Sequence, residues 1–98
     1  MNHSLIIKPE VERDLRDAME WYNEQRAGLG DEFLAEVERA FDRICENPGL
    51  HSCVHRDIRR ALTKRFPYGV FFIVEGDCVA VLAVMHVSRH PGRWRQRR

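Results

Sequence analysis

Residues 70–87 read VFFIVEGDCVAVLAVMHV, and this segment constrains the architecture more strongly than any other part of the chain. Val70 to Val74 is an unbroken run of β-branched and aromatic side chains, which predicts a central strand buried on both faces. Glu75-Gly76-Asp77 has the composition of a short hairpin turn. Cys78 to Val87 is a second long apolar run, interrupted only by His86. The sequence therefore predicts two neighbouring antiparallel strands inside a sheet.

The segment before this pair, Ile58 to Phe66, alternates only loosely between apolar and charged residues. Three of its apolar side chains are spaced four residues apart and are expected to face a core: Ile58, Leu62 and Phe66. Pro67 and Gly69 separate this segment from the strand that follows. We predict a third, less regular strand here.

Two amphipathic helices are predicted in the N-terminal half. From residue 9 to about residue 25, apolar side chains recur at spacings of three and four: Val11, Leu15, Ala18, Met19 and Tyr22. A broader apolar face follows: Phe33, Leu34, Val37, Ala40, Phe41 and Ile44. Gly28 and Gly30 separate the two helices, Asp31 is placed to cap the second, and Asn47-Pro48-Gly49 ends it. A tight link of this kind predicts an antiparallel helical hairpin.

Leu5-Ile6-Ile7 is too short an apolar run for a helix and is predicted to be an edge strand. The element order is then β-α-α-β-β-β, which is typical of an α+β domain. We expect the helical hairpin to pack on one face of a twisted, mostly antiparallel sheet. Residues 1–98 are long enough for one such domain with a single core.

Charge is divided unevenly between the two halves of the chain. Residues 1–50 carry six Lys or Arg against twelve Asp or Glu, whereas residues 51–98 carry ten against three. The C-terminal half is therefore expected to offer a cationic face to an acidic partner. The alternative is that the two halves neutralise each other when they pack. This alternative is least expected for the terminal run, residues 93–98, which reads RWRQRR.

Several functional classes are excluded or disfavoured by composition. The apolar runs are too short to span a bilayer, and the N-terminus lacks the basic start and apolar stretch of a secretory signal. Three scattered cysteines argue against a disulfide framework and for a reducing compartment, so we expect a cytoplasmic protein. Gly-rich phosphate loops, nucleophile elbows and HExxH motifs do not occur, and no cofactor is expected.

The candidate binding residues lie at strand ends and near the C-terminus: Arg60, Arg65, Arg89, Arg93, Trp94 and Arg95. Guanidinium groups beside an aromatic ring suit phosphates and a stacked base, and they equally suit the carboxylates of an acidic peptide. The alternative is that arginines at a sheet edge only keep that edge soluble.

Residues 51–55, HSCVH, carry three metal-ligating residue types in alternation. On an extended strand His51, Cys53 and His55 would share one face, where a transition metal could bind. A second cysteine pair that would complete a standard site is missing, so a solvated loop is preferred and no metal is predicted.

The element order resembles the RelE/ParE toxins of bacterial toxin–antitoxin modules, which are also known as plasmid-stabilisation proteins. Three segments carry the likeness: the helix from Pro9 to Trp21-Tyr22, Phe66-Pro67-Tyr68 before a hydrophobic strand, and residues 84–89, VMHVSR, closing the next. The resemblance covers nearly the whole chain. It implies a small toxin that inhibits growth, neutralised by a cognate antitoxin in a hetero-oligomeric complex.

Members of that family act on different targets: RelE-like toxins cleave messenger RNA on the ribosome, and ParE-like toxins poison DNA gyrase. The RelE-like pattern has two lysines on its second strand, an arginine directly after the tyrosine that opens the third, an arginine that ends the fourth, and a tyrosine near the C-terminus. When this chain is aligned to the pattern at Tyr68, the two lysine positions are occupied by Arg60 and Leu62. The arginine after the tyrosine becomes Gly69, and only Arg89 is retained. The terminal tyrosine becomes Trp94, which has no acidic proton to give. Because arginine stays protonated, it is a poor general base. The resemblance therefore favours a ParE-like gyrase inhibitor that performs no catalysis.

Two alternatives stay open. Arg89 and His90 are weak catalytic candidates, with His86 a weaker one, because histidine can exchange protons near neutral pH. A ribosome-dependent endoribonuclease would use Arg60, Arg65, Arg89 and His90. The other alternative is a decayed module that only binds its partner.

Overall fold

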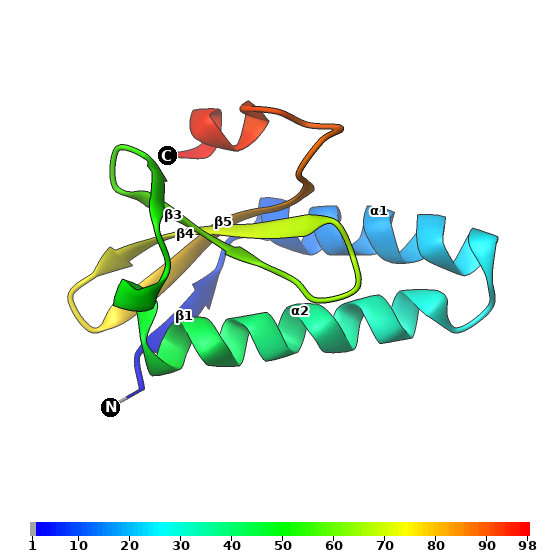
Figure 1. Ribbon diagram of the computed structural model, residues 1–98, viewed down its shortest axis with the longest axis horizontal. Coiled ribbons are helices and arrows are strands. Elements are labelled where there is room, and N and C mark those ends of the chain that lie inside the picture. Colours follow the sequence, from blue (N-terminus) through cyan, green and yellow to red (C-terminus); the bar gives the residue numbers. More distant parts are fainter. Residues whose placement is uncertain (1) are drawn as a thin grey trace.

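A computed structural model of the chain describes residues 2–98. The predicted central hairpin is formed by β4 (Tyr68–Glu75) and β5 (Cys78–His86), which pair antiparallel along their whole length (Figure 1). Gly76 occupies the turn between them with a φ of 60°, a left-handed conformation that glycine adopts without steric cost. Both strands are buried over most of their length, β4 from Tyr68 to Ile73 and β5 from Val79 to Met85.

Five strands form one sheet in the order β1-β5-β4-β3-β2. The edge strand β1 (Ser4–Ile7) pairs parallel with β5, and every other pair is antiparallel. On the other side, β3 (Ile58–Leu62) pairs with β4, and β2 (Cys53–His55) forms the second edge. The predictions of β1 at an edge and of β4 at the centre are confirmed. The strand β2 was not predicted, because three residues in irregular register leave no alternating pattern to detect.

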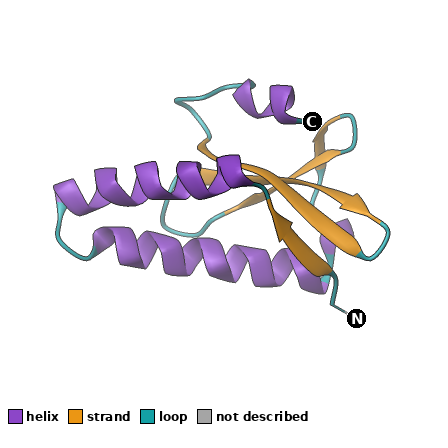
Figure 2. Ribbon diagram, turned by 180° about the vertical axis from the view of Figure 1, so that it is seen from behind, coloured by secondary structure: helices purple, strands orange, loops and turns teal. Residues whose placement is uncertain are grey.

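The two long helices, α1 (Pro9–Gln25) and α2 (Leu29–Glu46), form the predicted hairpin on one face of the sheet (Figure 2). A 3-10 turn, η1 (Pro48–Leu50), follows α2 where Asn47-Pro48-Gly49 was expected to end it. The prediction that Asp31 caps α2 is wrong. Gly28 is the capping residue, and Asp31 lies in the first turn, where its charge complements the helix dipole. None of the helices within residues 2–98 has the length and apolarity needed to cross a membrane.

Packing between the helical hairpin and the sheet forms the first of two apolar clusters. Its centre is aromatic: the ring of Phe33 lies 4.8 Å from Tyr68, 5.3 Å from Tyr22 and 5.4 Å from Phe66, centroid to centroid. Tyr22 and Phe33 come from different helices, whereas Tyr68 comes from the sheet. These contacts hold the hairpin against the beginning of β4, where several candidate site residues lie.

The second cluster lies on the opposite face of the sheet, under a short C-terminal 3-10 helix, η2 (Arg93–Arg97). Trp94 of η2 is 8 % exposed and stacks on Phe71 of β4, with ring centroids 4.4 Å apart and an interplanar angle of 11°. The rest of this cluster includes Ile58, Ile73, Leu82 and Met85. The C-terminal segment therefore covers the sheet face that the helices leave open.

The segment predicted as one strand over Ile58 to Phe66 divides into two parts. The strand β3 ends at Leu62, and the chain then turns, with Arg65 at a φ of 72° and the Thr63 hydroxyl donating to the Phe66 carbonyl oxygen. Ile58 and Phe66 are buried as expected, but in different clusters. The expectation that Leu62 faces a core is wrong, since 53 % of it is exposed. Residues four apart share a face of a strand, so the spacing does not itself exclude burial; Leu62 is the last residue of β3 and belongs to neither apolar cluster.

Candidate functional site

A cleft of about 390 Å³ opens between α1 and the segment that follows β5. We call it the α1 cleft. Its charged and titratable lining consists of Arg13, Asp14, Asp17, Tyr68, Arg89, His90, Arg93 and Arg97. Three candidates from the sequence, Arg89, His90 and Arg93, are therefore brought together here. Sequence reasoning missed Arg13 and Asp17. A spacing of four that places them in one row with Trp21 on α1 was the available signal.

Arg89 is held against the N-terminal helix rather than against the sheet. Its guanidinium carbon lies 4.9 Å from the centroid of the Trp21 ring, a cation–π arrangement worth about 0.5–1 kcal/mol at an exposed site. Trp21 is 43 % exposed, and its ring edge meets Tyr22 at 5.1 Å. Among residues 2–98, no carboxylate forms an ion pair with Arg89. Its positive charge is therefore available to a partner that enters the α1 cleft.

The position of Arg89 depends on the turn that ends β5. Nδ1 of His86 accepts hydrogen bonds from the backbone N–H groups of Ser88, at 3.0 Å, and Arg89, at 3.1 Å. An imidazole that accepts at Nδ1 carries its proton at Nε2 and is neutral. Burial lowers the pKa of His86 most, and the nearby charges of Arg89 and His90 lower it further. His86 is therefore a neutral cap for the turn that carries Arg89.

His90 and Tyr68 are two other groups in the α1 cleft that could exchange protons. Nδ1 of His90 lies 3.2 Å from Nη1 of Arg93. Burial raises the pKa of the Tyr68 hydroxyl, although the nearby charge of Arg89 opposes this shift. A phenol with a raised pKa stays protonated near neutral pH and is not a general base. The catalytic roles suggested for Arg89, His90 and His86 stay predictions.

Arg60 lies in a different place. It contributes, with Arg43 and Lys64, to a second cleft of about 390 Å³ beside β3, which we call the β3 groove. No residue lines both the α1 cleft and the β3 groove. The sequence led us to expect one cationic face, and the structure instead divides these cations between two clefts. Counting charges along the sequence cannot distinguish the two clefts, because a count does not show which part of the folded sheet each cation lies beside.

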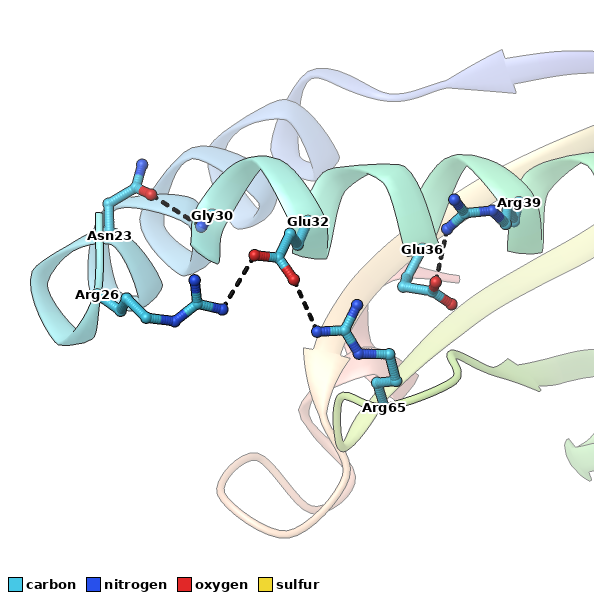
Figure 3. Close-up of polar contacts among 7 residues, drawn as sticks. All are labelled: Asn23, Arg26, Gly30, Glu32, Glu36, Arg39 and Arg65. Carbon is cyan, nitrogen blue, oxygen red and sulfur yellow. Dashed lines mark hydrogen bonds and ion pairs between the residues drawn. The ribbon is translucent and has the colours of Figure 1, made fainter. Parts of the chain in front are cut away.

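Arg65 is already paired within the molecule. Its Nη2 donates to one carboxylate oxygen of Glu32 at 2.7 Å, and Arg26 donates to the other at 2.9 Å (Figure 3). The hydrogen bond from Arg65, and then that from Arg26, lowers the pKa of Glu32. A partner would have to compete with Glu32 for Arg65, so a role in binding is less accessible to it than to Arg60 or Arg89.

The C-terminal run is largely committed to holding its own chain. Arg97 pairs with Asp14 through two hydrogen bonds, and Arg98 pairs with Asp57 through two more. Trp94 cannot stack on a nucleotide base without leaving Phe71. Arg95 lies over Trp94, with its guanidinium carbon 5.4 Å from the ring centroid. The expectation that this run escapes internal neutralisation is wrong for Arg97 and Arg98, while Arg93 and Arg95 pair with no carboxylate within residues 2–98.

The geometry does not support a metal site on residues 51–55. The ring of His51 meets Phe72 at 5.8 Å, on the helix side of the sheet, whereas the ring of His55 meets Trp94 at 6.2 Å, on the other side. The register shift between Cys53 and His55 breaks the alternation that would have put the three ligands together. Within the described residues, no three His, Cys, Asp or Glu side chains are grouped to hold a metal ion.

Comparison with known proteins agrees with this architecture. The fold is similar to that of a chain from the chromosomal ParDE TA system of P. aeruginosa, with a TM-score of 0.77, 14 % identity, and coverage of 86 % of this chain and 95 % of that one. It is also similar to a mutant of the E. coli toxin RelE in the free state, with a TM-score of 0.64, 14 % identity, and coverage of 90 % and 86 %. No curated protein matches the sequence. The family model for the ParE toxin of type II toxin–antitoxin system, parDE, matches residues 5–91. The predicted resemblance is confirmed, and the chain belongs to the ParE toxin family of type II toxin–antitoxin modules.

Proposed function

We propose that this toxin stops growth in the cytoplasm by binding and inhibiting DNA gyrase, without catalysing a reaction. A cognate antitoxin neutralises it in a hetero-oligomeric complex. The observation that supports a binding mechanism best is the separation of Arg60 and Arg89 into two clefts that share no residue. Cleavage of RNA by its own 2′-hydroxyl needs a base, an acid and cations that converge on one phosphate.

The groups nearest to Arg89 also suit binding better than proton transfer. Nδ1 of His86 is occupied by two backbone N–H groups, and Nδ1 of His90 lies against Arg93. By contrast, Arg89 and Trp21 together present an exposed cation on an aromatic ring. Arginine and tryptophan are enriched among the residues that dominate protein–protein binding energies. The α1 cleft is accordingly our proposed contact with the target, and its charges would steer the encounter.

Expression in a growing bacterium tests this proposal. Induction of the wild-type protein without antitoxin should arrest growth and relax plasmid supercoiling, while the cellular messenger RNA stays intact. The variant Arg89→Ala should fail to arrest growth. A matched control is Arg16→Ala, which removes an exposed arginine of α1 outside the α1 cleft and should arrest growth as the wild type does.

Two other outcomes contradict the proposal. Cleaved messenger RNA with unchanged supercoiling would assign the toxin to the endoribonuclease group, and loss of cleavage in His90→Ala would then identify the acid or base. Growth that continues normally, with the protein present and folded, would indicate a decayed module that only binds its partner.

A further inference from the structure

The strand β1 is the last strand on its side of the sheet, and its outer edge is open (Figure 1). Ser4, Ile6 and Ile7 are exposed, and the apolar side chain of Ile6 is the most open of the strand at 47 %. The N–H of Ser4 donates to the carbonyl oxygen of Asp77, where the pairing with β5 begins. Because backbone groups alternate in direction along a strand, those of Ile6 also face β5, whereas those of Leu5 and Ile7 face outward.

The interior of β1 contains none of the features that usually prevent pairing at an edge. Proteins protect exposed edges with prolines, charged residues or bulges within the edge strand. Residues 4–7 read SLII, and their register with β5 is regular. The opposite edge of the sheet differs, because β2 has three residues and a register shift between Cys53 and His55. Of the two edges, β1 is therefore the one suited to accept another strand.

Charges of opposite sign lie at the two ends of β1. Lys8 follows the strand in an extended conformation, with a φ of −74° and a ψ of 154°, so it continues the direction of β1. Asp77 lies at the other end, where it is hydrogen-bonded to Ser4. Both charged residues are exposed, and neither forms an ion pair within residues 2–98. An antiparallel strand of the same sequence would place each Lys8 at the end where the other copy carries Asp77.

We propose that β1 pairs antiparallel with β1 of a second copy of the chain, across a two-fold axis at Ile6. The outward N–H and C=O groups of Leu5 then bond to those of Ile7 in the second copy, and the reverse pairing follows from the symmetry. Ile6 faces Ile6 of the second copy as a non-hydrogen-bonded pair, the arrangement in which opposite side chains lie closest. Lys8 lies opposite Ser4 of the second copy and therefore near its Asp77.

A second copy suits this edge better than an unrelated strand because β1 is complementary to itself. One register satisfies the outward backbone groups, covers the exposed isoleucine and brings together charges that lack ion-pair partners within residues 2–98. The contact is small compared with that of a permanent dimer, so we expect dimers at high protein concentration that dissociate on dilution. This inference does not depend on the proposed function.

Sedimentation velocity of the purified full-length protein, over a series of concentrations, tests the inference. The wild type should change from monomer to dimer as its concentration increases. Ile6→Lys places like charges opposite each other at the two-fold axis and should weaken the dimer about tenfold. The matched control is Leu62→Lys, which changes an exposed leucine of β3, a strand that β4 and β5 separate from β1. It should dimerise as the wild type does.

Exchanging the two charges tests the register of the pairing. Lys8→Asp and Asp77→Lys each bring like charges together and should each weaken the dimer about threefold. The double variant Lys8→Asp/Asp77→Lys carries both charges in exchanged positions and should dimerise as the wild type does. Added salt should weaken the wild-type dimer. A circular dichroism spectrum of each variant checks that it is folded.

Three results would overturn the inference. A wild-type protein that stays monomeric at high concentration would leave this edge to a strand of another protein. A dimer that is equally stable in Ile6→Lys would place the contact elsewhere on the surface. A double variant no tighter than the single charge reversals would exclude the proposed register. Because none of these measurements involves gyrase or growth, failure here leaves the proposed function standing, and failure of the gyrase test leaves this inference standing.

Discussion

Asp14 of α1 and Arg97 of η2 form a two-pronged ion pair, with N–O distances of 2.6 and 3.0 Å, between residues 83 positions apart in the sequence. The same carboxylate accepts the backbone N–H of Val84 at 3.1 Å, and Arg97 also donates to the carbonyl oxygen of Leu82. The hydrogen bond to Asp14 raises the pKa of Arg97 further above its usual value. This pair joins the first helix, the last strand and the C-terminal segment, and both of its residues line the α1 cleft.

Removing the charge of Asp14 should loosen that junction. In Asp14→Asn, Arg97 keeps a neutral acceptor but loses its counter-charge in a site where the two side chains are only 13 % and 20 % exposed. We expect the free energy of unfolding, measured in urea, to fall by about 1–2 kcal/mol, less than for a fully buried pair because both groups still touch water. The control Asp57→Asn breaks the exposed pair with Arg98 and should cause no measurable change. Equal losses in the two variants would contradict this account.

Trp94 should contribute to stability rather than to base stacking. Trp94→Ala removes the ring that covers Phe71 and opens the second cluster, so we expect a loss of about 3 kcal/mol in the free energy of unfolding. The control is Trp21→Ala, which truncates the exposed tryptophan of the α1 cleft and should cost far less. A folded Trp94→Ala protein with wild-type stability would show that η2 does not cover the sheet in solution.

The link between the helices requires a glycine at position 30. A Cβ there would lie 2.5 Å from the Met19 carbonyl oxygen and 2.7 Å from the Asn23 side chain, whose Oδ1 accepts the Gly30 N–H (Figure 3). Gly30→Ala should therefore destabilise the protein by about 2 kcal/mol or more in thermal or urea unfolding. Gly49→Ala is the control, since the nearest atom to its Cβ would be 3.7 Å away. If both alanines are tolerated equally, the helices are not as close as described.

Stability should depend on His86 at mildly acidic pH. Burial, followed by the charges of Arg89 and His90, lowers the pKa of His86 in the folded protein below the value of 6.5 expected in the unfolded chain. The unfolded chain then binds a proton more readily. This contribution to stability is complete above pH 6.5 and declines as the pH falls below it. The free energy of unfolding should therefore decrease on going from about pH 7 to about pH 5.

The variant His86→Asn separates this contribution from that of His51, whose pKa is also lowered by burial first and then by Arg43. The asparagine side-chain oxygen can accept the same two backbone N–H groups of Ser88 and Arg89 and does not titrate. Unfolding of His86→Asn should consequently show a weaker pH dependence than that of the wild type. An identical pH dependence in the two proteins would mean that the Nδ1 hydrogen bonds of His86 do not hold in solution.

Local patterns in the sequence were sufficient for the helical hairpin and the central strands. The position of α1 follows from apolar residues spaced by three and four from Val11 to Tyr22, and those of β4 and β5 from two apolar runs around Gly76. These signals lie within one element and need no knowledge of tertiary contacts. β2 carries no such signal, since its pairing with β3 is short and irregular.

The candidate site was only partly predictable, because its ion pairs join residues that lie far apart in the sequence. The guanidinium groups were found as a composition, but whether each one is free depends on partners far away in the chain. Arg97 and Asp14 are an example, and so are Arg65 and Glu32. The alternative that the two halves neutralise each other therefore describes Arg65, Arg97 and Arg98, whereas Arg60 and Arg89 form no ion pair within residues 2–98.

We propose that this toxin acts by binding gyrase through the α1 cleft. The most direct measurement is ATP-dependent supercoiling of relaxed plasmid by purified gyrase, with increasing amounts of the wild-type protein and of Arg89→Ala. Inhibition of supercoiling should increase with the amount of wild-type protein added, up to the amount that saturates the gyrase. Arg89→Ala should inhibit far more weakly at the same concentrations. Undiminished supercoiling at a large excess of folded wild-type protein would contradict the proposal.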